Sequence, residues 1–116
     1  EAESYNGPSI VIAYSHCINH GIDMMKGMDQ QKMAVQSGMW PLYRYDPRLK
    51  AQGKNPFQLD SREPDYSKLE QYMYAEVRFK SLVQASPERA KVLFEKQRDL
   101  IERRYKEYRY LADRPF

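Results

Sequence analysis

The sequence contains one uninterrupted, mostly β-branched apolar run, Ser9-Ile10-Val11-Ile12-Ala13-Tyr14, directly after Gly7-Pro8. The run is too short for a helix and is followed by polar residues, which is the pattern of a strand buried on both faces. Six residues at about 3.3 Å each span roughly 20 Å, enough to cross the core of a small domain. The sequence therefore predicts a parallel-type strand over residues 9–14.

The loop after this run carries the side chains with the most chemistry. It reads Ser15-His16-Cys17-Ile18-Asn19-His20-Gly21 and holds the only cysteine and both histidines of the chain. The loop follows the carboxyl end of the expected strand, which is where open α/β sheets bind ligands and cofactors. We therefore expect the functional site in this loop.

The next part of the chain is expected to add one helix and one or two further strands. Asp23 is a good N-cap for a helix over residues 24–36, and Ser37-Gly38 is a fitting stop, because glycine takes the left-handed conformation beyond a helix end. Strand character resumes over residues 39–45, and residues 56–61 form a candidate for one more short strand.

Residues 65–116 are expected to be helical. Apolar side chains recur at three- and four-residue steps from Leu69 to Leu82. Ser86-Pro87 then favours a new helix, with serine at the N-cap and proline at the first helical position, and Arg114-Pro115 ends it. The pattern predicts that a C-terminal helical hairpin follows an α/β part over residues 1–64.

Composition argues against several classes of partner. The net charge of +3 arises within residues 65–116, where nine acidic residues are interspersed among twelve basic ones. No basic stripe forms, so we expect no nucleic-acid partner. No apolar run approaches the roughly 20 residues of a membrane span, so we expect no membrane partner. A single cysteine permits no internal disulfide, which favours a cytoplasmic location. The start at Glu1 and the lack of neighbours for a doubly buried strand favour a piece of a larger protein.

The residues alone leave the chemistry of Cys17 open. A thiol nucleophile needs a base, usually brought from far along the chain, and no distant histidine is present. A zinc site made of His16, Cys17 and His20 has at most three of the four ligands that structural zinc requires. A [4Fe-4S] cluster normally takes four thiolates, so three would come from elsewhere. A packed core thiol is the plain structural alternative for Cys17, as a hydrogen bond to the backbone is for each histidine.

Three stretches carry a resemblance to a known family. They are Cys17-Ile18-Asn19-His20-Gly21, Trp40-Pro41-Leu42-Tyr43-Arg44-Tyr45 and Asn55-Pro56-Phe57-Gln58-Leu59-Asp60-Ser61. Around them, nearly all of residues 7–111 resembles the C-terminal region of pyruvate:ferredoxin (flavodoxin) oxidoreductase, with a weaker likeness in the helical tail.

The resemblance implies an α/β fold class. Residues 1–64 would be the end of a thiamine-diphosphate-binding-type domain, with a buried parallel strand, a helix and one or two further strands. Residues 65–116 would be a helical C-terminal extension. The family converts pyruvate and CoA to acetyl-CoA and CO2 on thiamine diphosphate and Mg²⁺, and reduces ferredoxin or flavodoxin through [4Fe-4S] clusters. It works as a large homodimer in anaerobic metabolism.

The resemblance also implies a role for Cys17. This residue would be the fourth thiolate ligand of the [4Fe-4S] cluster nearest the thiamine, with backbone amides of Ile18, Asn19 and Gly21 as donors to the cluster sulfides. The other three thiolates and most of the thiamine and magnesium site would lie in the remainder of the parent polypeptide. The isolated chain is then expected to be catalytically inert and to be poorly soluble or to oligomerise.

Two other interpretations stay open. One is a stand-alone helical protein-interaction module without a metal. The other is a small zinc-binding protein that uses His16, Cys17 and His20.

Overall fold

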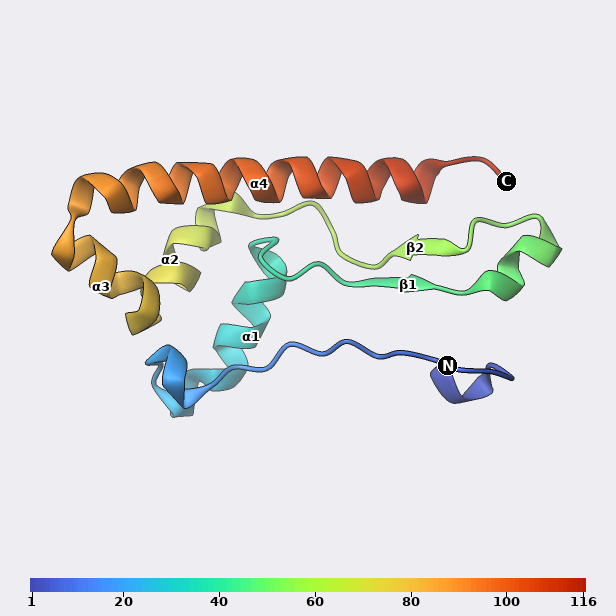
Figure 1. Ribbon diagram of the computed structural model, residues 1–116, viewed down its shortest axis with the longest axis horizontal. Helices are drawn as coiled ribbons and strands as arrows, with labels where there is room; N and C mark the ends of the chain where they lie inside the picture. The colour runs from blue at the N-terminus through green and yellow to red at the C-terminus, as the bar shows by residue number, and fades with distance from the viewer.

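The computed structural model describes all of residues 1–116 and shows an elongated set of helices beside one β-hairpin (Figure 1). Short 3-10 turns connect the longer elements. In chain order these elements are α1 (Gly27–Gln36), β1 (Tyr43–Tyr45), β2 (Phe57–Leu59), α2 (Leu69–Tyr74), α3 (Val77–Ala85) and α4 (Pro87–Asp113). The chain is thus mixed α/β and mostly helical.

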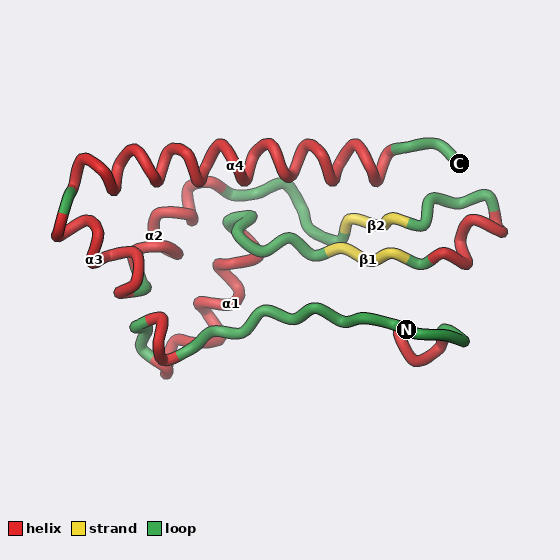
Figure 2. Tube along the Cα trace, viewed as in Figure 1, coloured by secondary structure: helices red, strands yellow, loops and turns green.

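The apolar run at residues 9–14 is extended but is not a strand (Figure 2). Ile10, Val11 and Ile12 are 87%, 77% and 70% exposed. The expectation of a buried parallel strand is therefore wrong for this chain. The reason is that a strand exists only through hydrogen bonds to a neighbour, and the two strands present, β1 and β2, pair with each other.

The sheet is an antiparallel pair in which Tyr43 lies opposite Leu59 and Tyr45 lies opposite Phe57. The strands expected over residues 39–45 and 56–61 are therefore confirmed, although each is three residues long. The ring of Tyr43 lies 5.2 Å from that of Phe57 and 5.2 Å from that of Tyr108 on α4. The hairpin thus packs its aromatic face on α4.

The predicted helix ends are largely confirmed. The Asp23 carboxylate accepts a hydrogen bond from the Met25 amide at 3.0 Å, but the turn it caps, Met24–Lys26, is 3-10, and α1 begins directly after it at Gly27, three residues later than expected. Gly38 has the expected left-handed conformation, with φ of 82°. The last helix begins at Pro87 as expected and runs without a break to Asp113.

The helix expected from Leu69 to Leu82 is broken in its middle. Between α2 and α3, Glu76 has an extended conformation with φ of −106° and ψ of 126°. The break directs the Glu76 side chain inward, where it is fully buried, and frees the Val77 amide for a hydrogen bond outside the helix. The helical part therefore has three helices, of which α3 and α4 meet at Ser86 and contact each other.

The buried core is small for a chain of this length. It is a cluster of five apolar side chains, contributed by α1, α2 and α4: Ala34, Leu69, Tyr72, Met73 and Ile101. The Cα radius of gyration is 17.1 Å, whereas a compact domain of this size has about 13 Å. The accessible surface is 8637 Å², against about 6,600 Å² for a compact protein of the same mass. The chain therefore exposes about 2,000 Å² more than a compact domain would.

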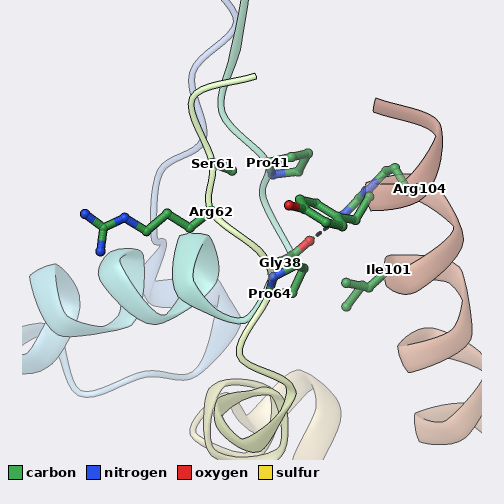
Figure 3. A pocket seen from close by; sticks show the side chains of 8 residues that line it. Gly38, Pro41, Ser61, Arg62, Pro64, Ile101 and Arg104 are labelled. Carbon is green, nitrogen blue, oxygen red and sulfur yellow. Dashed lines mark hydrogen bonds between the residues drawn. The ribbon is translucent and has the colours of Figure 1, made fainter. Parts of the chain in front are cut away.

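Arg104 ties α4 to the turn that follows α1 (Figure 3). Its Nη2 donates to the carbonyl oxygens of Gly38 at 2.7 Å and Met39 at 2.8 Å. Gly38 lies so close to α4 that a Cβ atom placed on it would be 2.7 Å from the side chains of Ile101 and Pro64. This contact fixes the start of the β-hairpin against the core.

We expect Gly38→Ala to destabilise the chain by about 2–5 kcal/mol, because it adds left-handed backbone strain to a steric clash in the core. Gly53→Ala is the matched control. Gly53 has a similar φ of 71°, but nothing lies within 4 Å of its Cβ position, so only the strain of about 1–2 kcal/mol applies. Urea denaturation at low micromolar concentration measures both variants. Equal losses for the two would contradict the close packing of Gly38.

None of the helices has the length together with the hydropathy that a membrane span requires.

Candidate functional site

Cys17 lies where the extended N-terminal segment ends and a short 3-10 turn begins. It is the N-cap residue of the short 3-10 turn Ile18–His20, with φ of −144° and ψ of 142°. It forms no disulfide, and the residue is partly exposed. Cys17 is not among the buried core residues of this chain.

The structure does not gather three or more His, Cys, Asp or Glu side chains into a group that would hold a metal ion. The Nδ1 atoms of His16 and His20 are both buried without a hydrogen-bond partner. The expected backbone hydrogen bond is therefore absent at the Nδ1 atom of each histidine. This chain can supply only one of the four thiolate ligands of a [4Fe-4S] cluster, through the single thiol of Cys17.

The backbone around Cys17 has two free donors. The amides of His20 and Gly21 are used inside the turn, donating to the carbonyls of Cys17 at 3.0 Å and Ile18 at 2.9 Å. The amides of Ile18 and Asn19 donate to no protein acceptor. The expected set of donors is therefore corrected: Gly21 is not available, and Ile18 and Asn19 are.

Tyr14 anchors the loop at its N-terminal end. Its hydroxyl lies 2.8 Å from the hydroxyl of Tyr72 and accepts a hydrogen bond from Arg78 Nη2 at 3.3 Å. Its ring packs on Trp40, with centroids 5.4 Å apart. Burial, together with the hydrogen bond to Tyr14, raises the pKa of Tyr72, so this hydroxyl stays protonated and polar at neutral pH.

Gly21 anchors the loop at its C-terminal end. Its carbonyl accepts a hydrogen bond from the Val77 amide at 3.2 Å, which is the amide freed by the break between α2 and α3. Its φ is 72°, and a Cβ atom at this position would lie 2.4 Å from the Cβ of Val77. The loop therefore approaches α3 as closely as its backbone allows.

Glu76 lies behind the loop and connects the two anchors. The carboxylate is fully buried and accepts hydrogen bonds from Gln30 Nε2 at 2.8 Å and from Arg78 Nε. Gln30 also donates to the Tyr72 carbonyl at 2.9 Å. The Nδ1 atom of His20 lies 3.9 Å from Glu76 Oε1. Residues 72–78 thus contact both ends of the loop, and the buried Glu76 carboxylate lies at the centre of this polar network.

Sequence reasoning identified Cys17 but missed Gln30, Glu76 and Arg78. One signal was available for Glu76, which follows Tyr72 by four residues and so extends the buried face of the predicted helix. An acidic residue at such a position indicates a buried charge with partners. Those partners come from α1 and α3, and no local pattern predicts that contact.

The chain is 57% identical to a pyruvate-flavodoxin oxidoreductase of Nostoc sp. over 98% of its own length, which is 9% of the relative. It is 46% identical to a pyruvate:ferredoxin oxidoreductase of Moorella thermoacetica over 97% of its length, or 10% of the relative. The chain is a homologue of one segment of the pyruvate:ferredoxin (flavodoxin) oxidoreductases. The resemblance noted from the sequence is confirmed.

A third relative has a different name. The chain is 40% identical to a mitochondrial pyruvate dehydrogenase [NADP(+)] of Euglena gracilis, over 99% of its length and 6% of the relative. No protein-family model matches the chain. The chain thus spans about a tenth or less of the pyruvate oxidoreductases it matches.

Proposed function

We propose that this chain is the C-terminal segment of a pyruvate:ferredoxin (flavodoxin) oxidoreductase and that Cys17 supplies one thiolate to the [4Fe-4S] cluster nearest the thiamine. The observation that carries the proposal is the setting of Cys17 in a chain that is homologous to these oxidoreductases. Cys17 is the only cysteine, is a partly exposed residue, and lies in a loop fixed at both ends by hydrogen bonds to residues 72–78. A ligand position needs this combination of access and rigidity.

When bound, the cluster supplies one-electron transfer. The residues of this chain position its ligand. Tyr14 and Gly21 limit how far the Cys17 sulfur moves, because each end of the loop is hydrogen-bonded to the α2–α3 junction. The amides of Ile18 and Asn19 have no protein acceptor and so would be available to acceptors beside the thiolate. Donors of this kind stabilise negative charge on cluster sulfur and raise the reduction potential.

The activity we propose belongs to the whole parent enzyme. It would convert pyruvate and CoA to acetyl-CoA and CO2 with thiamine diphosphate and Mg²⁺, and reduce ferredoxin or flavodoxin, as a cytoplasmic homodimer. The cofactors would be bound mainly by residues outside this chain. Residues 1–64 would complete the thiamine-diphosphate-binding-type domain, and residues 65–116 would form a helical extension that packs on it.

Alkylation of Cys17 tests the ligand role directly. In the parent enzyme, purified anaerobically, iodoacetamide should leave Cys17 unlabelled, because a thiolate bound to iron is not available as a nucleophile. After chelation of the iron, mass spectrometry should find the same thiol labelled. A cysteine introduced by Ser15→Cys, at an exposed position of the same loop, is the control and should be labelled in both states. Equal labelling of Cys17 before and after chelation would overturn the proposal.

A further inference from the structure

Glu76 is the one charged residue among the 12 buried residues of the chain. A charge that is removed from water is screened much less than an exposed one, so its field reaches further. The Glu76 carboxylate is therefore a fixed negative charge that acts beyond its own hydrogen bonds.

The neighbours of Glu76 compensate this charge only in part. Gln30 donates to Oε2 at 2.8 Å, but its amide group is neutral. Arg78 is the one cation that hydrogen-bonds the carboxylate, and its side chain is 37% exposed, against 0% for that of Glu76. Water therefore screens the positive end of this ion pair more than the negative end. A net negative field remains on the buried side of the pair.

The Cys17 loop lies close to this buried carboxylate. The Nδ1 atom of His20 is buried and lies 3.9 Å from Glu76 Oε1 without a hydrogen bond. The amide of His20 donates to the Cys17 carbonyl at 3.0 Å. One imidazole and one 3-10 turn thus separate the carboxylate from the Cys17 backbone, on the order of 10 Å at a rise of about 2.0 Å per residue. Two unit charges at this separation interact by more than thermal energy when the effective dielectric constant is about 20.

We propose that Glu76 lowers the reduction potential of the cluster that Cys17 would ligate. The inference rests on the proposed function. Reduction adds one electron to the cluster and breaks no bond; the electron would come from the oxidation of pyruvate and leave for ferredoxin or flavodoxin. A fixed negative charge nearby makes the added electron less favourable. Glu76 would therefore act against the amides of Ile18 and Asn19, which raise the potential.

Arg78 would shift the potential in the opposite direction. Its guanidinium bonds to the Glu76 carboxylate and also to the Tyr14 hydroxyl, at 3.3 Å in the second contact, so it too is near the loop. A positive charge at this position favours the reduced cluster, although its exposure to water makes the effect smaller. The two members of the ion pair thus predict shifts of opposite sign. A mere loss of packing would not reverse the sign.

A redox titration of the anaerobically purified parent enzyme, followed by EPR, tests the proposal. The signal to follow is the one that Cys17→Ser abolishes or alters. Glu76→Gln removes the charge and keeps the shape of the side chain. At the midpoint potential of the wild type, it should raise the ratio of reduced to oxidised cluster from one to at least about three. Glu70→Gln, at an exposed position on α2, is the matched control and should leave this ratio within about 1.5-fold of the wild type.

Two further variants separate charge from packing. Glu76→Asp keeps the charge but shortens the side chain, so its ratio should stay closer to the wild type than that of Glu76→Gln. Arg78→Gln should lower the ratio below one, and its sign decides the question if Glu76→Gln assembles no cluster. The proposal is overturned if Glu76→Gln behaves like Glu70→Gln, if the two Glu76 variants shift equally, or if Arg78→Gln raises the ratio.

The result is separable from the cluster proposal. If Cys17→Ser leaves the iron content and the EPR spectrum unchanged, Cys17 is not a ligand, and the proposed function fails together with this inference. If Cys17→Ser alters one cluster while Glu76→Gln leaves the potential of that cluster unchanged, Cys17 stays a ligand and only the role of Glu76 fails.

Discussion

Replacing Glu76 by alanine is expected to lower the free energy of unfolding by about 2–3 kcal/mol. The substitution leaves Gln30 Nε2 without its carboxylate acceptor and Arg78 without its ion-pair partner. The side chain of Arg78 is 37% exposed, so water compensates part of the loss and the effect falls below that of a fully buried pair. The loop should lose rigidity together with the fold, because Tyr14 and Gly21 are both bonded to residues 72–78.

Urea denaturation of the chain measures this effect, and Glu70→Ala is the matched control. Glu70 is exposed on α2, so its loss should change stability by no more than about 0.5 kcal/mol. Amide exchange provides a second readout, in which residues 14–21 should be deprotected more strongly than the centre of α4. If Glu76→Ala were as mild as Glu70→Ala, the buried network would have no part in holding the loop.

Replacing Cys17 by serine should have the largest effect on the activity of the parent enzyme. A hydroxyl is a poor ligand for iron beside three thiolates, so the cluster should be lost or distorted. Changes to groups that only support a ligand already cost about 10–100-fold in metal affinity or activity. We therefore expect reduction of ferredoxin or flavodoxin to fall at least about a hundredfold.

Ser15→Ala is the control for this experiment. Ser15 lies in the same loop, is exposed, and bonds only to the adjacent His16 carbonyl at 3.0 Å. Ser15→Ala should leave the reduction of ferredoxin or flavodoxin within about twofold of the wild type. Substitution of an exposed residue outside the core and outside any buried polar network changes little. A fall of equal size in the two variants would assign the effect of Cys17→Ser to a disturbed loop rather than to a lost ligand.

The parts of the fold that sequence predicted are those with local causes. Asp23 caps the start of the helical region, Gly38 takes the left-handed conformation after α1, and Pro87 begins α4. Each of these depends on a residue type and its immediate neighbours. The two short strands were predicted as well, but their antiparallel pairing was not.

The errors have non-local causes. Residues 9–14 have the composition of a buried strand, but their hydrogen bonds require strands that this chain does not provide. The break at Glu76 interrupts a good helical pattern because its carboxylate is held by Gln30 and Arg78 while the Val77 amide bonds to Gly21. The contacts of Gln30 with Glu76 and of Gly21 with Val77 join residues 46 and 56 positions apart, and a window of helical length does not include them.

The candidate site was predicted because its residue types occur nowhere else in the chain, and not because their spacing matches a known motif. Cys17 is the only cysteine, and the two histidines flank it. The residues alone left nucleophile, zinc, cluster and core thiol open, and the assignment to a cluster rests on family resemblance. Homology to one segment of the pyruvate oxidoreductases now supports the family, and the role of Cys17 stays a prediction.

The most direct test of that role is the iron content of the anaerobically purified parent enzyme, with its reduced-state EPR spectrum, for wild type and Cys17→Ser. We predict that the variant loses iron equivalent to one cluster per subunit, or keeps it with one altered cubane signal, while the signals of the other clusters persist. Unchanged iron and an unchanged spectrum would show that Cys17 is a loop thiol without a metal, and the central claim would fail.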